Sequence, residues 1–425
     1  MSVDYGNNLT WKATTDKDRR FNRISDFGDM EEYPQSFSIH NVNLLEDGQL
    51  IEDGIILIDE GCIRFAGRRA DFVVPEDLDI LDGNGWYAAP GFIDLQLNGA
   101  YGVDFTCNPE KLVAVAELLP KSGVTAFLPT IITSPLDEYS GKLQAILAAQ
   151  AATAEPAASL KTSARVLGAH LEGPFLNPQM PGAHQASLFQ QPTSANLQKF
   201  APLEAVYLMT LAVEMSGGLE AISWLRERNI TPSIGHSTAS AELVGQAFSQ
   251  GLSYATHLFN AMPPLHHRNP GLVGAVLGSE QARCGLILDG IHLHPLIVKL
   301  VYQALGAERL TLVTDAMAAM GMPPGSYRIA GREVIAAENS ARLQDGRLAG
   351  SLLSMDQAVC NMVTFSGCSL AEAVRMASTT PAEVLGIDDQ FGHLKAGYVA
   401  DIVLLDKALQ VQVVYVGGRL AFSRE

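Results

Sequence analysis

Short apolar runs alternate with longer segments of helical periodicity through the middle of the chain. The sequence predicts a strand for each apolar run, with strand ends near Leu97, Pro129, Leu171, Leu211, Ile234, Thr256, Leu288 and Val313. Helical patterns lie between these runs, beginning near Pro109, Ala241 and His294, and several close with a glycine after the last turn. Strands that alternate with helices are typical of βα units and a parallel sheet. Eight such units predict an α/β fold, a (β/α)8 TIM barrel, with a doubly wound open sheet as the alternative.

The two ends of the chain carry a different pattern, that of antiparallel strands. Residues 55–67 form two apolar runs joined by Glu60-Gly61, and residues 398–405 and 411–422 repeat this pattern with a turn at Gly417-Gly418. Because isolated hairpins are marginally stable in water, we expect both termini to pack into one small β-sandwich.

The predicted domains follow from these patterns. Residues 37–88 and 393–425 form the two parts of the sandwich, and residues 89–392 form the barrel inserted between them. Residues 1–36 are polar with mixed charges and no apolar period, which predicts a loosely packed N-terminal arm.

The composition fits a large buried core and narrows the choice of partners. Hydrophobic residues make up 47% of the 425 residues and charged residues 18%, as expected where buried parallel strands are apolar throughout. A formal net charge of −17 argues against nucleic acid or an anionic membrane surface as a partner. The five cysteines lack CxxC spacing, which favours reduced thiols, and no run reaches the ~20 apolar residues of a membrane span. We therefore expect a cytoplasmic protein.

Polar side chains gather where the predicted strands end. They are Gln96, Asn98, His170, Glu172, His236, His257, His292 and Asp315. Because the carboxyl ends of barrel strands share one rim, residues remote in sequence can meet there. For any single histidine, a cap on a strand or a bond to a backbone carbonyl is the more ordinary interpretation. For the whole set, a shared site is the better one.

Three of these residues predict a metal centre. Glu172, His236 and His257 offer one carboxylate oxygen and two imidazole nitrogens, a set that suits one divalent ion per subunit and leaves a position open for water. Zinc is the first expectation, and iron, cobalt and manganese can use the same ligands. Such an ion lowers the pKa of water to about 7, so the predicted reaction is hydrolysis.

Two further residues have chemistry that fits hydrolysis. Asp315, in LVTDAM, is predicted to accept a proton from the water and return it to the leaving amine, with a helix cap as the alternative. His292, in ILDGIHLHP, is predicted to donate to the oxyanion of a tetrahedral intermediate. His294 points the same way if this segment is extended, so the pattern does not separate the two histidines.

A basic segment follows one of the predicted metal ligands. Residues 256–271, THLFNAMPPLHHRNPG, contain Asn260, Ala261 and Arg268, and an arginine beside backbone amides and an asparagine can bind a phosphate. A solvated basic loop is the alternative.

Seven strings in this chain resemble, in order and spacing, the N-acetylglucosamine-6-phosphate deacetylases of the amidohydrolase superfamily. They are PGFIDLQLNG, HLEGPFL, IGHS, THLFNAM, DGIHLHP, TDAM and LAGSLLSM. The resemblance extends from about Phe37 onward. It implies metal-dependent hydrolysis of N-acetyl-D-glucosamine 6-phosphate, a phosphorylated amino sugar, to D-glucosamine 6-phosphate and acetate.

The resemblance also implies roles for individual residues. Glu172, His236 and His257 correspond to the metal ligands, and Asp315 to the catalytic acid/base. The implied substrate contacts are Ala183, Asn260, Ala261, Arg268, His292, Leu348, Ala349 and Gly350. In the family, the residue matching Arg268 reaches the phosphate of a neighbouring subunit, which implies a homodimer.

One departure from the wider superfamily bears on the number of metals. Many amidohydrolases carry His-x-His after the first barrel strand to hold a second metal, whereas this chain has Gln96 and Asn98, whose amide oxygens are poorer ligands. We therefore expect a single metal. The alternatives for function are deacetylation of N-acetylgalactosamine 6-phosphate or an N-acyl amino acid, and a catalytically silent protein of this fold that serves in assembly.

Overall fold

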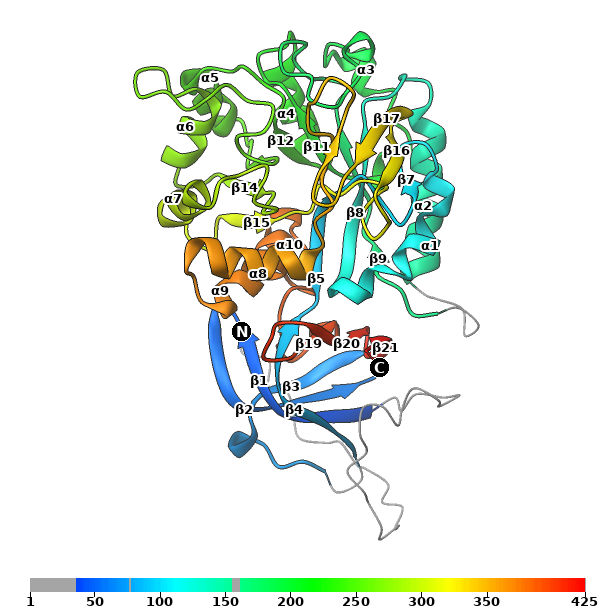
Figure 1. Cartoon of the computed structure of the whole chain (residues 1–425), viewed down its shortest axis with the longest axis vertical. Coiled ribbons are helices and arrows are strands. Elements are labelled where there is room, and N and C mark those ends of the chain that lie inside the picture. The colour runs from blue at the N-terminus through cyan, green and yellow to red at the C-terminus, as the bar shows by residue number, and fades with distance from the viewer. Residues whose placement is uncertain (1–35, 76–77, 155–160, 425) are drawn as a thin grey trace.

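The computed structural model describes residues 36–75, 78–154 and 161–424. The predicted N-terminal arm lies, apart from Ser36, outside these ranges. The described chain forms a barrel and, at one end of it, a smaller sheet built from both chain ends, with β5 leading from the sheet into the barrel (Figure 1). Within the described ranges, no helix is long and apolar enough to cross a membrane.

Eight parallel strands form the barrel, as predicted. In sheet order they are β5 (Phe92–Leu97), β8 (Val124–Ile132), β10 (Ala169–Glu172), β11 (Val206–Leu211), β12 (Thr231–Ile234), β13 (Tyr254–Ala255), β14 (Arg283–Leu286) and β15 (Leu310–Leu312), and β9 (Arg165–Val166) pairs beside β8. The segment after β15 returns to β5, where Ala316 pairs with Leu97. Both faces of the strands are covered, so all nine residues of β8 are buried and the strand has no polar alternation.

Helices surround the barrel; the first six lie between successive barrel strands, and the last three follow the final one. They are α2 (Tyr139–Ala154), α3 (Ser194–Leu197), α4 (Gly218–Arg226), α5 (Ala241–Ser249), α6 (Gly271–Gly278), α7 (Pro295–Leu305), α8 (Met355–Ser366), α9 (Leu370–Ala377) and α10 (Thr379–Leu385). The helix predicted from Pro109 is broken: α1 (Leu112–Ala116) is flanked by 3-10 turns at Pro109–Lys111 and Leu119–Ser122. Pro120 causes the break, because it has no N–H for a helical hydrogen bond.

Both chain ends build one seven-stranded sheet, as predicted, although it is mixed: residues 36–46 and 79–90 pair in parallel, where the pattern predicted antiparallel strands. Its order is β21 (Arg419–Ser423), β20 (Val411–Val416), β19 (Ile402–Leu405), β4 (Asp79–Pro90), β1 (Ser36–Glu46), β2 (Gln49–Asp59) and β3 (Cys62–Arg68). The sheet folds over a core of its own. Phe37 of β1 packs on Tyr415 of β20 with 5.4 Å between ring centroids, although two strands separate them along the sheet.

A small antiparallel sheet that the sequence analysis did not predict lies beside the barrel mouth (Figure 1). It comprises β16 (Gly325–Ile329), β17 (Arg332–Ala336) and β18 (Ala341–Arg342). Ile329 and Val334 pack in one buried cluster with Ile132, at the end of β8, and with Met317. This cluster fixes the small sheet next to the carboxyl ends of the barrel strands.

Candidate active site at the barrel rim

A cavity of about 350 Å³ opens at the carboxyl ends of the barrel strands. Ten of the twelve predicted site residues line it: Glu172, Ala183, His236, His257, Asn260, Ala261, His292, Asp315, Leu348 and Gly350. Ala349 is buried and its N–H bonds Ala341, so it lies behind the cavity wall. Arg268 also lies outside the lining.

The backbone turns sharply where three site residues leave their strands. His236, His257 and Asp315 have φ angles of 49°, 23° and 48°, in the left-handed region that non-glycine residues rarely adopt. The turn at His257 ends β13 at Ala255, one residue before the predicted position, and β14 ends at Leu286, two residues early. Uncommon backbone conformations of this kind concentrate at functional sites.

Glu172, His236 and His257 meet in one buried cluster. Oε1 of Glu172 lies 3.3 Å from Nε2 of His236 and 2.8 Å from Nε2 of His257, and the three ligand atoms lie within 4.8 Å of one another. Ligands at zinc distances on a tetrahedron are about 3.4 Å apart, so this donor set has the spacing and chemistry of a metal site. Among the described residues, the acidic, histidine and cysteine side chains that could share a metal ion are these three.

The Glu172 carboxylate is ionised within this cluster. Burial would raise the pKa of Glu172, but hydrogen bonds from His184, His236 and His257 hold that pKa well below its usual range. The pKa of His257 is raised, because the bond to Glu172 and its charge outweigh the effect of burial. A buried carboxylate surrounded by imidazoles is the environment that a divalent cation stabilises.

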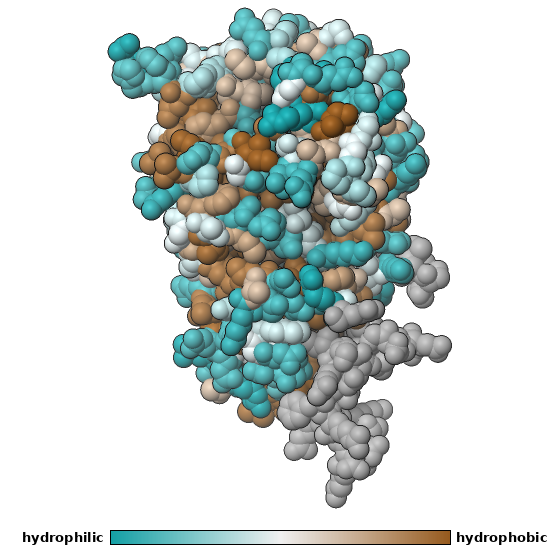
Figure 2. Space-filling view, viewed as in Figure 1, coloured by the Kyte–Doolittle hydropathy of each residue, from teal (hydrophilic) through white to brown (hydrophobic). Residues whose placement is uncertain are grey.

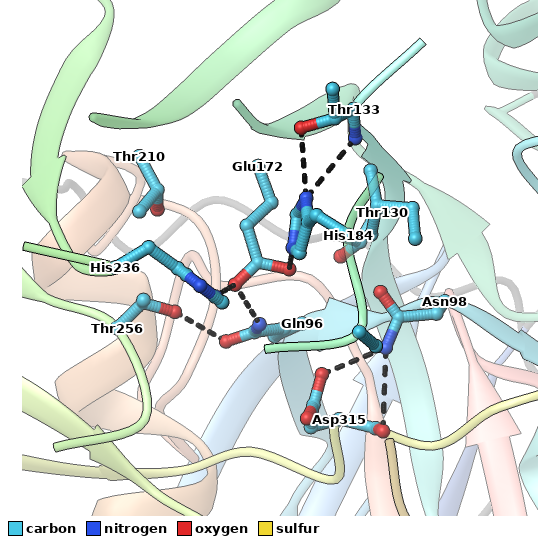
Figure 3. Close-up of polar contacts among 12 residues, drawn as sticks. Gln96, Asn98, Thr130, Thr133, Glu172, His184, Thr210, His236, Thr256 and Asp315 are labelled. Atoms are coloured by element: carbon cyan, nitrogen blue, oxygen red, sulfur yellow. Dashed lines mark hydrogen bonds and ion pairs between the residues drawn. The ribbon is translucent and has the colours of Figure 1, made fainter. Parts of the chain in front are cut away.

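Gln96 holds the Glu172 carboxylate from the first strand. Its Nε2 donates to Oε1 of Glu172 at 3.0 Å, and its Oε1 accepts a hydrogen bond from the hydroxyl of Thr256 (Figure 3). With one partner on each side, the amide has a single orientation. Gln96 therefore contributes a fixed donor at the position where related barrels place a histidine.

The structure adds His184, which the sequence analysis missed. Burial lowers the pKa of His184 to about 4, so the ring is neutral at pH 7. Its Nδ1 accepts from the backbone N–H of Thr133 at 3.3 Å, which leaves the ring proton on Nε2, 3.4 Å from Oε2 of Glu172. His184 thus lines the cavity as a neutral ring, with its Nε2–H directed at the Glu172 carboxylate (Figure 3).

Two arginines fasten the loop that carries His184. Arg332, on β17, donates to the carbonyl oxygens of Ala183 at 2.7 Å and His184 at 3.2 Å, and Arg347 donates to that of Gly182 at 2.8 Å. The small sheet therefore positions a site residue that lies more than a hundred residues away in sequence. The signal in the sequence was weak, because PGAH follows HLEGPFL in a loop without periodicity.

Asp315 lies at the closure between the last strand and the first. Its N–H donates to the carbonyl of Gln96 at 2.8 Å, and its Oδ1 accepts from Nδ2 of Asn98 at 2.7 Å. Burial and the charge of Glu172 raise the pKa of Asp315 to about 6. The neighbouring Thr314 hydroxyl donates to Asp94 at 2.5 Å, which anchors this segment to β5.

The structure separates the histidines that the pattern left open. His292 lines the cavity, and its Nδ1 lies 2.7 Å from Oδ2 of Asp289. His294 caps α7, where its Nδ1 accepts from the N–H of Leu296 at 3.2 Å. His170 is buried between threonines, with Nε2 2.8 Å from Oγ1 of Thr210, so it has the structural role of a satisfied core histidine.

The fold and this cluster define a metal-dependent barrel hydrolase. The model of the Amidohydrolase family matches residues 87–421, and the chain belongs to this family, within its N-acetylglucosamine-6-phosphate deacetylase branch.

Known proteins of the branch resemble the chain over most of its length. It is 37% identical to N-acetylgalactosamine-6-phosphate deacetylase of Escherichia coli O157:H7, over 88% of this chain and 97% of that protein. It is 34% identical to N-acetylglucosamine-6-phosphate deacetylase of Bacillus subtilis (strain 168), over 91% and 98%. A crystal structure of a variant of the Mycobacterium smegmatis N-acetyl-D-glucosamine-6-phosphate deacetylase, in complex with N-acetyl-D-glucosamine-6-phosphate, superposes with a TM-score of 0.83 at 28% identity, covering 92% of this chain and 100% of that one.

Proposed function

We propose that this chain hydrolyses the acetamide of N-acetyl-D-glucosamine 6-phosphate to D-glucosamine 6-phosphate and acetate, in amino-sugar catabolism or recycling. The observation that carries the proposal is the buried Glu172, His236 and His257 cluster with Asp315 beside it, at the wall of a cavity sized for a sugar. The complex of the M. smegmatis relative with that sugar phosphate supports this substrate.

Glu172, His236 and His257 would hold the metal ion. When bound, a divalent cation there polarises a carbonyl oxygen and lowers the pKa of water to about 7. We propose zinc as the metal, because one carboxylate and two imidazoles suit it. Iron, cobalt and manganese can use the same ligands and are the alternatives in the test below.

The protein side chains supply the proton transfers and the hydrogen bonds to substrate. Asp315 accepts the proton that the attacking water loses and returns it to the leaving nitrogen, which departs as an amine. His184 donates from Nε2 to the carbonyl oxygen as negative charge develops there, and His292 donates beside it. Asp289 holds the other nitrogen of His292, so Nε2 of that ring faces the substrate.

The sugar fills the rest of the cavity. Asn260, Ala261 and Ala183 contact it from the loops after β13 and β10, and the turn of residues 348–350 contacts it from the opposite wall. These residues carry no charge, and Arg347 is the arginine in the cavity lining.

We further propose a homodimer in which Arg268 binds the phosphate in the neighbouring subunit's site. Arg268 is exposed and lies outside the lining of its own cavity, which supports action on a neighbour. Leu296 and Leu300 are exposed one turn apart on α7, and Leu265 is exposed on the loop that carries Arg268. Figure 2 shows apolar surface on the side where Figure 1 places α6 and α7.

We also propose that the protein is cytoplasmic. All five cysteines are free in the structure, which fits a reducing compartment.

The test is acetate release from metal-stripped protein after addition of zinc, iron, cobalt or manganese. N-Acetylglucosamine 6-phosphate should be hydrolysed with at least one of these metals, and unphosphorylated N-acetylglucosamine much more slowly. Protein that binds no divalent ion and stays inactive after metal is added would instead be a silent member of the fold. Equal rates on the phosphorylated and unphosphorylated sugars would refute the role of Arg268.

A second substrate has a specific observation in its favour, the 37% identity to the E. coli N-acetylgalactosamine-6-phosphate deacetylase. The two sugars differ in one epimeric hydroxyl. Measuring kcat/KM for both phosphorylated sugars decides between them: a ratio above 10 in favour of the galactosamine compound would reassign the substrate.

A further inference from the structure

Asn98 carries an unsatisfied acceptor in the wall of the cavity. The residue is only 3% exposed, and among the described residues its Oδ1 has no hydrogen-bond partner. Burying such an oxygen without a hydrogen-bond partner destabilises the folded protein. An acceptor that lines a cavity and lacks a partner there points to a donor on the ligand.

The orientation of this amide is set by its neighbours. Nδ2 of Asn98 donates to Oδ1 of Asp315 at 2.7 Å and to its backbone oxygen at 3.3 Å. The reversed amide would place Oδ1 against two oxygens, which is repulsive. The backbone is also fixed, since the N–H of Asn98 bonds Ala316 and its carbonyl accepts from Phe105. Oδ1 is therefore the atom turned away from Asp315 (Figure 3).

Oδ1 of Asn98 lies close to the carboxylate that handles the proton. The two hetero-atoms of an amide are about 2.3 Å apart, so no more than about 5 Å separates Oδ1 of Asn98 from Oδ1 of Asp315. A single nitrogen atom of the substrate can contact both residues at hydrogen-bond distance. The scissile acetamide has such a nitrogen, and it carries one hydrogen.

We propose that Oδ1 of Asn98 accepts the N–H of the scissile acetamide and so orients the leaving nitrogen toward Asp315. This assignment rests on the proposed function. As water adds to the carbonyl carbon, the nitrogen becomes pyramidal, and an N–H held by Asn98 fixes the direction of its lone pair. Asp315 then delivers to that lone pair the proton taken from water, and the C–N bond breaks to give the amine and acetic acid, which ionises to acetate.

Asn98 thereby makes the site selective for secondary amides. A site built to bind an N–H discriminates against an analogue that lacks it, because its acceptor stays unpaired. The neutral amide also suits this place better than a carboxylate would, since a second negative charge beside Asp315 would raise the pKa of Asp315.

The experiment compares two substrates that share a leaving nitrogen. They are N-acetylglucosamine 6-phosphate and its N-methyl derivative, a tertiary amide without the N–H. Asn98→Ala should lower kcat/KM for the secondary amide by about 10-fold to 100-fold, and should lower the ratio of secondary to tertiary amide by at least 10-fold. Asn108→Ala is the matched control and should change neither value, because the side-chain amide of Asn108 bonds Glu110 and lies outside the cavity lining.

Asn98→Asp keeps an acceptor in the same place and is the second variant, which is informative even if the alanine variant does not fold. It should lower both rates through its charge while keeping the ratio near the wild-type value. An unchanged ratio in Asn98→Ala, with both rates reduced equally, would show that Asn98 only positions Asp315 and would overturn the proposal. So would an unchanged rate on the secondary amide, which would indicate a purely steric effect on the methyl group.

Metal content supplies an independent outcome. Two ions per chain in the wild type, falling to one in Asn98→Ala, would assign Oδ1 to a second metal and overturn the contact with substrate. A wild type that is inactive on the secondary amide with every metal would overturn the proposed function and this inference together. An active wild type with an unchanged ratio would overturn the role of Asn98 alone.

Discussion

Gly182 offers a test of how tightly the loop before His184 packs on the metal cluster. Its φ is +51°, and a Cβ added there would lie 2.8 Å from Cε1 and 3.4 Å from Nδ1 of His236. The His236 ring has little room to retreat. Its Nδ1 bonds the carbonyl oxygen of Met180 at 2.8 Å, and the rings of His184 and His257 lie 4.6 Å and 5.1 Å away, centroid to centroid.

Gly182→Ala should therefore act on the fold and on the metal at once. A left-handed conformation costs alanine about 1–2 kcal/mol. Carbon atoms pack at about 3.5–4.0 Å, so relieving the contact requires His236 or the loop to move by several tenths of an ångström. We expect the free energy of unfolding to fall by about 1–3 kcal/mol. We also expect metal affinity to fall by about 10-fold to 100-fold, as when the support of a ligand is lost.

Competition with a chromophoric chelator measures the affinity, and denaturant unfolding of the metal-free protein measures stability separately. Gly245→Ala is the matched control. Gly245 lies within α5 with no atom within 4 Å of the added Cβ, so alanine there should stabilise the protein by up to about 1 kcal/mol and leave metal binding unchanged. Wild-type metal affinity in Gly182→Ala would refute the packing of this loop against His236.

Three further predictions concern the proton carrier and the contact between the barrel and the seven-stranded sheet. Asp315→Asn should lower kcat by about 100-fold to 10,000-fold with unchanged metal content, and a variant within 10-fold of wild type would remove Asp315 from the role. Burial and the charge of Glu172 raise the pKa of Asp315 to about 6, and a bound cation lowers that pKa. Because only the ionised carboxylate accepts a proton, kcat/KM should fall as the pH drops through a value at or below about 6. A fall in kcat/KM centred above pH 7 would contradict this assignment. Asp401→Ala removes the carboxylate that lies 2.5 Å from the Arg165 guanidinium, and it should lower the free energy of unfolding by about 3–5 kcal/mol while kcat stays unchanged. A loss below about 1 kcal/mol in denaturant unfolding would show that the two side chains do not form a buried ion pair.

The repeating part of the fold could be predicted because its physics is local. A strand covered on both faces is a continuous apolar run, and eight such runs separated by helical periods are enough to indicate the barrel. The hairpins at Glu60-Gly61 and Gly417-Gly418 could be predicted for the same reason, since their turn residues lie between two apolar runs. The break at Pro120 also had a local signal, the proline itself.

Other features depend on contacts that no local pattern records. The sheet β16–β18 is short and half exposed, so its apolar alternation is weak, and its place beside the cavity depends on packing against Ile132 and Met317. His184 sits in a loop, and Arg332 and Arg347 hold that loop beside the cluster by donating to its carbonyl groups. A histidine of this kind has no spacing relative to a strand end and cannot be separated from other loop histidines by sequence pattern.

The side-chain amides of Gln96 and Asn98 bear on how many metal ions the site holds. Each amide donates to a buried carboxylate that faces the cavity, Gln96 to Glu172 at 3.0 Å and Asn98 to Asp315 at 2.7 Å. One divalent cation balances the charge of these two carboxylates, and the amide donors then satisfy oxygen lone pairs without adding charge. Histidines at both positions would offer nitrogen ligands and favour a second cation between the carboxylates, with a net positive site. We therefore expect a single metal in this chain, with the two amides holding Glu172 and Asp315.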